Sequence, residues 1–153
     1  MNIINLEQSF YTIKMLHIFM SLSFLFFAVW LFVRSVNGIV KNKAYSKTDK
    51  MLSYCFIITL YLQLIFGFVL FSNLGSEMGF SYQSADSSLK LVSKRLWPIE
   101  HIVMMLFALF IANLGLIISI NTLLDKRKYW TTIIYYSISL FLIIFSLSGI
   151  YLF

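Results

Sequence analysis

The two histidines of this chain are its clearest candidates for chemistry. His17 and His101 each lie within about one helical turn of the start of a long apolar segment. An ionisable side chain in such a segment is costly, and it therefore usually has a partner or a ligand. Neutral imidazole is also a common ligand of metal ions. The first question is whether the fold can bring these two imidazoles together.

Composition places the chain among membrane proteins. Of its 153 residues, 60% are hydrophobic and only 12% are charged, which is too little charge to cover the surface of a soluble domain. The length suits one membrane domain, residues 1–153. The single Cys55 excludes a disulfide framework, and no C-x-x-C-H motif is present to attach a c-type haem. The formal charge of +6 comes from short segments between apolar runs, so we interpret it as an orientation signal and not as a nucleic-acid surface.

Four apolar runs organise the chain. They cover residues 15–33, 51–71, 97–121 and 129–153. Each is close to or above the roughly 20 residues that a helix needs to cross the hydrocarbon core. In lipid, all backbone polar groups must be satisfied internally, which requires helices in a chain this short. The sequence therefore predicts an all-α membrane protein, an antiparallel bundle of four transmembrane helices. Residues 1–10 either extend the first helix or lie along the interface.

The distribution of basic residues predicts the orientation. The segments after the first and third runs contain Arg34, Lys41, Lys43, Lys47, Lys50, Lys126, Arg127 and Lys128. The opposite side has Lys14, Lys90, Lys94 and Arg95. Because cytoplasmic loops carry the excess of Lys and Arg, we expect both termini to lie outside the cytoplasm. Thr48 and Asp49 are suitable N-cap residues for the second helix.

The two histidines are expected at the same depth. His17 lies two residues after the start of its run and His101 four after the start of its own, a difference of about 3 Å at 1.5 Å per residue. Gly67 and Gly149 each lie four residues before the outer end of the second and fourth runs. Two imidazoles and two glycines in one layer leave room for a flat macrocycle that is ligated from both sides. Imidazole is a common axial ligand of haem iron, so this layer is a candidate haem site.

A haem in this layer would need cations for its propionates. Lys14 lies one turn outward of His17, and Arg95 lies just outside His101. Charge-assisted hydrogen bonds are strong where water is scarce, and the guanidinium matches the two oxygens of a carboxylate. We therefore expect Lys14 and Arg95 to anchor the propionates.

Simpler interpretations of the same residues stay open. Glycine and alanine in membrane helices often serve close packing, and a histidine near an interface can bond to headgroups, water or a neighbouring serine. Glu100 beside His101 suggests a metal site of two histidines and one carboxylate. However, adjacent residues of a helix point about 100° apart, which disfavours that site.

Three stretches of the chain resemble a known family. "YSKTDKML", "YLQLIFGFVLF" and "RLWPIEHIVMMLFALFIANLG" are similar to segments of small four-helix bacterial inner-membrane proteins labelled cytochrome b. The resemblance implies haem b, with the glutamine and glutamate next to the ligands. By position, it assigns importance to His17, Gln63, Gly67, Glu100 and His101. Many members have a histidine where this chain has Tyr61, so the resemblance does not provide a ligand from the second helix.

Three functions are compatible with these observations. The first is a haem b protein of the electron-transfer class in the bacterial inner membrane. Its partners would be quinol, a periplasmic electron carrier or the other subunits of a respiratory assembly. The second is a structural subunit without a cofactor. The third is a haem enzyme that resembles the membrane protoporphyrinogen oxidases, whose first helix also contains a histidine, as in "LHIFMSLSFLFFAVWLFVRS". We favour an electron-transfer component over a stand-alone enzyme.

Overall fold

The chain folds into four long helices. The computed structural model describes the backbone of residues 3–81 and 88–152, and the side chains of residues 8, 9, 11–72 and 99–147. In chain order the helices are α1 (Ile3–Val40), α2 (Lys47–Ser81), α3 (Ser88–Asn121) and α4 (Asp125–Leu152). Apolar segments of this length are expected to form helices, because a helix satisfies the backbone hydrogen bonds within the segment.

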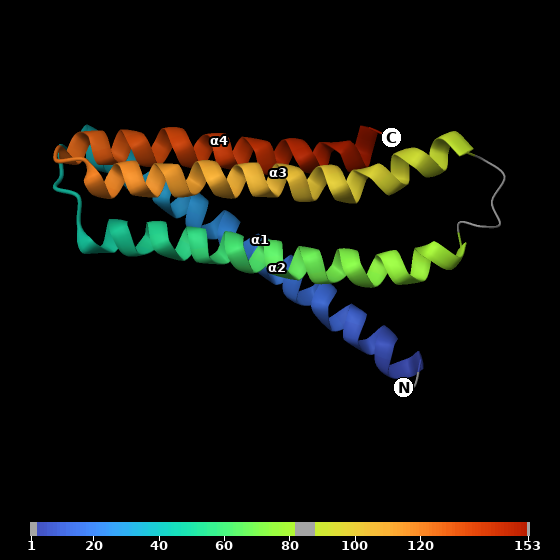
Figure 1. Cartoon of the computed structure of the whole chain (residues 1–153). Helices are drawn as coiled ribbons and strands as arrows, with labels where there is room; N and C mark the ends of the chain where they lie inside the picture. Colours follow the sequence, from blue (N-terminus) through green and yellow to red (C-terminus); the bar gives the residue numbers. More distant parts are fainter. Residues whose placement is uncertain (1–2, 82–87, 153) are drawn as a thin grey trace.

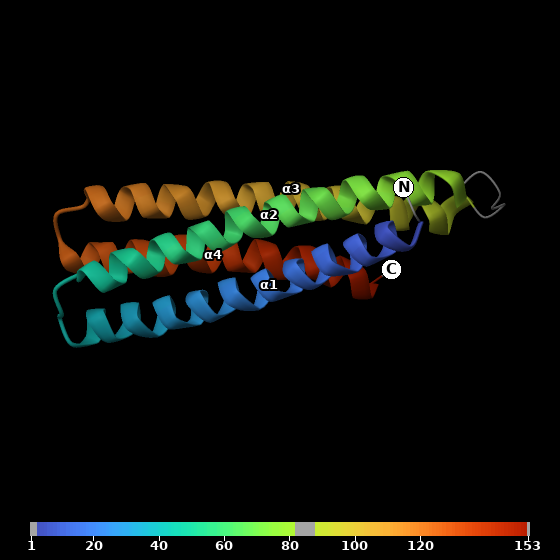
Figure 2. The same cartoon turned by 90° about the horizontal axis from the view of Figure 1, so that it is seen from below.

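The helices form an antiparallel bundle, as the sequence predicts. The two short connections, α1–α2 and α3–α4, lie at one end, and both chain termini lie at the other (Figure 1). α1 packs against α2 and α4, and α3 packs against the same two helices, which places α1 and α3 diagonally across the bundle (Figure 2). α1 also crosses the others at an angle, so that its N-terminal part diverges from α3 and α4 (Figure 1).

Every helix is longer than the apolar run that predicted it. α1 begins at Ile3 and ends at Val40, so residues 3–10 extend the first helix. α4 begins at Asp125, four residues before the predicted start, with the acidic side chain in its first turn. Polar residues continue a helix beyond the hydrocarbon because their backbone groups still need partners. A carboxylate also interacts favourably with the N-terminal end of the helix dipole.

Each helix contains a stretch that can cross a membrane. These stretches are Tyr11–Val40, Lys47–Ser72, Ile99–Asn121 and Asp125–Leu147. Their outward faces carry large apolar side chains such as Phe26, Phe107 and Phe141, the last of which is 65% exposed. The interior combines large apolar side chains such as Phe56 and Leu60 with small and polar residues, among them Ala108, Ala112 and Ser139. The Ser139 hydroxyl donates to the Ala108 carbonyl across the α3–α4 contact. Small residues at helix contacts and large apolar residues on the outer surface are typical of helices that pack in lipid.

The turn between α1 and α2 has a defined local structure. Asn42 adopts a left-handed backbone conformation, with φ of 46°. The amide of Lys43 donates to the Gly38 carbonyl at 2.9 Å, and that of Asn42 donates to the Ile39 carbonyl at 3.4 Å. This is the Schellman pattern that ends many helices, with asparagine in the position usually taken by glycine.

The cap of α2 differs from the prediction. Ser46, and neither Thr48 nor Asp49, precedes the first helical residue. The Ser46 hydroxyl accepts from the Asp49 amide at 3.3 Å, and the Asp49 carboxylate accepts from the Ser46 amide at 2.9 Å. The two residues therefore form a reciprocal capping box, which satisfies two backbone donors at once.

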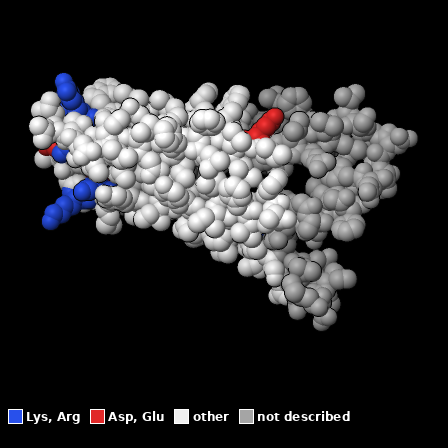
Figure 3. Space-filling view, in the orientation of Figure 1, with Lys and Arg blue, Asp and Glu red and all other residues white. Residues whose placement is uncertain are grey.

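Asp49 also joins three helices at the end of the bundle that contains the two short connections, which we call the lysine-rich end. Arg34 Nε of α1 lies 2.6 Å from Asp49 Oδ1, and the hydroxyl of Tyr129, from α4, donates to Asp49 Oδ2 at 3.1 Å. The aspartate is 3% exposed, so its charge is almost fully inside the protein. On the face shown in Figure 3, the basic side chains gather at this same end of the bundle.

Candidate functional site

His101 is held in a defined orientation by α4. Its Nδ1 lies 2.9 Å from the Ser146 hydroxyl, and that hydroxyl donates to the Ile143 carbonyl at 2.7 Å. A hydroxyl has one proton to donate, so the imidazole Nδ1–H is the donor to Ser146. In this tautomer, the lone pair of the ring is on Nε2. Sequence reasoning missed Ser146, although its position three residues before Gly149 places it in the expected histidine layer.

The imidazole of His17 is held by Gln63 of α2, which also bonds to Ser21, one turn from His17 on α1. The amide nitrogen of Gln63, on α2, lies 2.9 Å from His17 Nε2 and donates to the Ser21 hydroxyl at 2.6 Å. Ser21 in turn donates to the His17 carbonyl at 3.0 Å. Because the amide nitrogen carries two protons, Gln63 can donate to both partners. His17 Nε2 is then the acceptor, and the ring proton is on Nδ1.

The imidazole of His17 lies directly over Gly67 of α2. A Cβ added at Gly67 would lie 3.3 Å from His17 Cε1 and 3.8 Å from Nδ1. The Cε1–Nδ1 edge of the ring therefore faces the α2 backbone. Among the described residues, neither His17 Nδ1 nor Gln63 Oε1 has a hydrogen-bond partner, and both atoms are buried. Buried polar atoms without partners are uncommon and require a physical explanation.

Both histidines line one cavity of about 650 Å³. It lies in the half of the bundle that contains the chain termini, and all four helices contribute to its walls. Its polar lining comes from Lys14, His17, Ser21, Gln63 and His101. The rest is mostly apolar: Ile18, Phe24, Leu25, Leu70, Phe71, Ile102, Met105, Ile143, Ile144 and Leu147, with Gly67 between them. A volume of this size is within the usual range for small-molecule and cofactor sites.

Not all of the other predicted site residues line the cavity. Lys14 lines the cavity, but Glu100 is exposed and lies outside the lining. The side chain of Arg95 and the surroundings of Gly149 are outside the described residues. Tyr61, at the position where many members of the resembling family have histidine, is 46% exposed and also outside the cavity lining. Among the described residues, no group of three or more His, Cys, Asp and Glu side chains could hold a metal ion.

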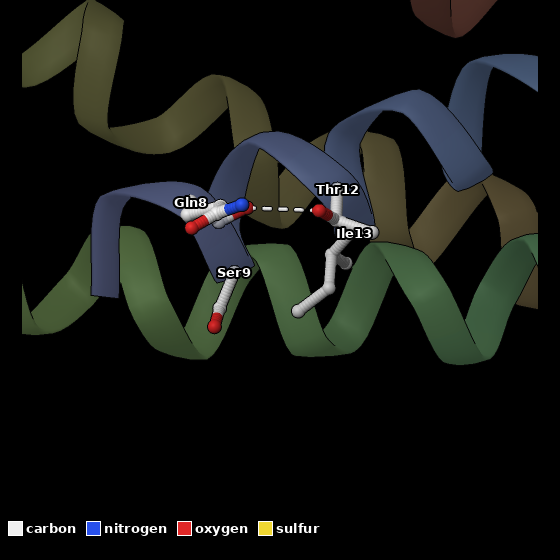
Figure 4. Close-up of a pocket in the computed structure, with 4 residues that line it drawn as sticks. All are labelled: Gln8, Ser9, Thr12 and Ile13. Carbon is white, nitrogen blue, oxygen red and sulfur yellow. Dashed lines mark hydrogen bonds between the residues drawn. The ribbon is translucent and has the colours of Figure 1, made fainter. Parts of the chain in front are cut away.

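Two further cavities have no histidine, lysine or acidic side chain in the described part of their lining. One, of about 380 Å³, lies between α1 and α4, is mostly apolar, and shares Ile144 with the histidine cavity. The other is lined by Gln8, Ser9, Thr12 and Ile13, all on α1 (Figure 4). There the Thr12 hydroxyl donates to the Gln8 carbonyl of its own helix at 2.9 Å. The histidine cavity is therefore the best candidate for a functional site.

No protein-family model, curated protein or solved structure matches this chain. Its fold and its cavity therefore define its class: an all-α bundle of four helices, each long and apolar enough to span a membrane, with two imidazoles in one internal cavity.

Proposed function

We propose that this protein is a small haem b-binding membrane protein of the electron-transfer class, in which His17 and His101 would bind the haem iron. The observation that carries the proposal is their shared cavity. Two imidazoles from diagonal helices line one mostly apolar cavity of about 650 Å³ at the same level of the bundle. Bound haem would supply one-electron redox chemistry there.

His101 fits the role of a residue that would bind the haem iron. Histidines that bind metals usually donate their other ring N–H to a nearby acceptor, which fixes both the tautomer and the ring orientation. Ser146 is such an acceptor for His101 Nδ1. The nitrogen with the lone pair, Nε2, is the one through which an imidazole commonly binds haem iron.

His17 fits the role with one further condition. Gly67 provides the space for its ring, because a side chain at that position would meet the imidazole. Its Nε2 is engaged by Gln63, so that hydrogen bond must open before the same lone pair can bind iron. Apolar walls, including Phe24, Met105 and Ile143, would keep water away from both ligands. Lys14, in the lining, and Arg95 are the proposed partners of the propionates.

The location follows from the charges and the apolar surface. We place the protein in the bacterial inner membrane, with lipid around its exposed apolar faces and the lysine-rich end in the cytoplasm. The histidine cavity is in the opposite half, near the outer leaflet. The partners that could exchange electrons there are quinol, a periplasmic electron carrier or other membrane subunits of a respiratory assembly.

One observation favours a second candidate, a structural subunit without a cofactor. Both histidines are hydrogen-bonded inside the protein, to Gln63 and to Ser146. Such bonds can hold helices together without any ligand. The two candidates differ in whether either imidazole binds iron.

Haem content and optical spectra separate the two candidates. The wild-type protein, purified from a haem-sufficient host, should contain about one low-spin haem b per chain in a reduced-minus-oxidised spectrum. His17→Ala and His101→Ala should each lose that spectrum and still insert in the membrane. Tyr61→Ala is the matched control, because it removes a ring outside the cavity and should keep the haem. A haem-free wild type would exclude the proposal, and porphyrinogen oxidation by the purified protein would support an enzyme instead.

A further inference from the structure

The contact between His17 and Gln63 involves the nitrogen that haem ligation needs. Gln63 is 4% exposed, and its amide nitrogen lies 2.9 Å from His17 Nε2. The other ring nitrogen, Nδ1, faces the α2 backbone at Gly67 and has little room for a metal. A ligand in the cavity would therefore have to use Nε2, whose lone pair already accepts from Gln63.

The closed contact is incompletely satisfied. His17 Nδ1 and Gln63 Oε1 are both buried and have no hydrogen-bond partner among the described residues. A buried donor or acceptor without a partner costs free energy, so this arrangement is less stable than a fully paired one. The contact is consequently one that a stronger interaction with His17 Nε2 can replace.

Ser21 would hold Gln63 in place after the contact opens. The Gln63 amide donates to the Ser21 hydroxyl at 2.6 Å, and Ser21 is itself bonded to the His17 carbonyl. Release of His17 therefore breaks one hydrogen bond of Gln63 and leaves the other. The cost of opening is that of a single hydrogen bond between neutral groups.

We propose that Gln63 competes with haem iron for Nε2 of His17, so that it closes the ligand-free site and limits the affinity of the loaded one. This inference rests on the proposed haem function and adds a positioning role for Gln63. In the closed state, Gln63 keeps the imidazole against Gly67. In the open state, the imidazole is available to a ligand in the cavity. Removal of the competing amide should strengthen haem binding, whereas removal of a simple supporting residue should weaken it.

Haem titration of the haem-free protein in detergent tests this prediction. Gln63→Met, which keeps length without a donor, should lower the haem Kd by about 2- to 10-fold, the value of one neutral hydrogen bond. Gln63→Asn, which is too short to reach His17, should give the same change and serves if the methionine variant does not fold. Thr59→Val is the matched control, because its hydroxyl bonds only to carbonyls of its own helix, Cys55 and Phe56, in the described structure.

A second measurement uses the haem-free protein alone. The ¹⁵N spectrum of His17 should show a protonated Nδ1 and a hydrogen-bonded Nε2, and Gln63→Met should shift the Nε2 signal while Thr59→Val leaves it unchanged. An unchanged or higher haem Kd in both Gln63 variants, with a wild type that binds haem through His17, would overturn the competition and leave the haem function standing. A wild type that binds no haem would overturn both.

Discussion

Arg34 Nε and Asp49 Oδ1 lie 2.6 Å apart and join α1 to α2 at the lysine-rich end of the bundle. The aspartate is almost completely buried, whereas the arginine side chain is 37% exposed. The second carboxylate oxygen accepts from Ser46 and from Tyr129. The carboxylate is thus fully paired, which is the condition under which a buried charge can be tolerated.

We predict that Asp49→Ala destabilises the bundle strongly. It leaves Arg34 Nε and the Ser46 amide without their shared acceptor, whereas the Tyr129 hydroxyl keeps the Ala44 carbonyl as an acceptor. The free energy of unfolding should therefore fall by about 3 kcal/mol. Unfolding in mixed micelles measures the change. Asp125→Ala is the control, because its more exposed ion pair with Lys128 is worth about 0.5 kcal/mol and its interaction with the α4 dipole about as much again. Equal effects of the two substitutions would contradict the assigned role of Asp49.

Gly38 of α1 packs closely against the ring of Tyr129 of α4. A Cβ at Gly38 would overlap the Tyr129 ring. Gly38→Ala should therefore destabilise the wild-type protein by about 1–3 kcal/mol, as overpacking usually does. The same change in a Tyr129→Ala background should cost much less, because the ring is gone. A double-mutant cycle on unfolding free energies measures this coupling. Additive effects would show that Gly38→Ala does not destabilise the protein through the Tyr129 ring.

The hydrogen bond from His101 to Ser146 should affect the haem affinity and the midpoint potential. Ser146→Ala removes the acceptor for Nδ1–H, and loss of such a partner commonly weakens metal binding about 10- to 100-fold. The measurement is haem Kd together with the redox midpoint potential. Ser139→Ala is the control on the same helix, because its hydroxyl bonds to carbonyls of Ala108 and Tyr135 and lies outside the cavity lining. A Kd and potential that stay at wild-type values in Ser146→Ala would argue that His101 is not a ligand.

Substitution of Gly67 should act through His17. An alanine Cβ would meet the imidazole at 3.3 Å and needs only a small shift, whereas leucine would displace the ring. We therefore expect near-normal haem content in Gly67→Ala and a large loss in Gly67→Leu. Pigment per chain measures both, with the amount of folded protein determined separately. Full haem content in Gly67→Leu would show that the ring position is not required.

The orientation can be tested without any ligand. Because eight of the twelve basic residues lie in or next to the two short connections, a reporter fused to the C-terminus should be active only outside the cytoplasm. A reporter inserted in the α1–α2 connection is the matched control and should show the opposite activity. A C-terminal fusion that is active in the cytoplasm would place the histidine cavity near the inner leaflet.

The sequence by itself determined the number of helices, their antiparallel order and the common level of His17 and His101. These features depend on the length of apolar runs and on position along them, which are local properties. The exact helix ends depended on more than apolarity, so the runs predicted shorter helices than the structure contains. The capping role of Ser46 was likewise missed, because Thr48 and Asp49 are equally good cap residues by type alone.

Only the tertiary structure decided which side chains meet. α2 is apolar on most of its circumference, so its composition does not say that Gln63 faces His17 while Tyr61 faces outward. Nor does spacing along the chain show that Ser146 faces His101, from 45 residues away, or that Tyr129 reaches Asp49, from 80 residues away. These contacts depend on the rotation of each helix about its axis and on its crossing angle with its neighbours. Helix packing and a few polar contacts determine the rotation and the crossing angle of each helix. Neither quantity can be predicted from the apolarity of a run.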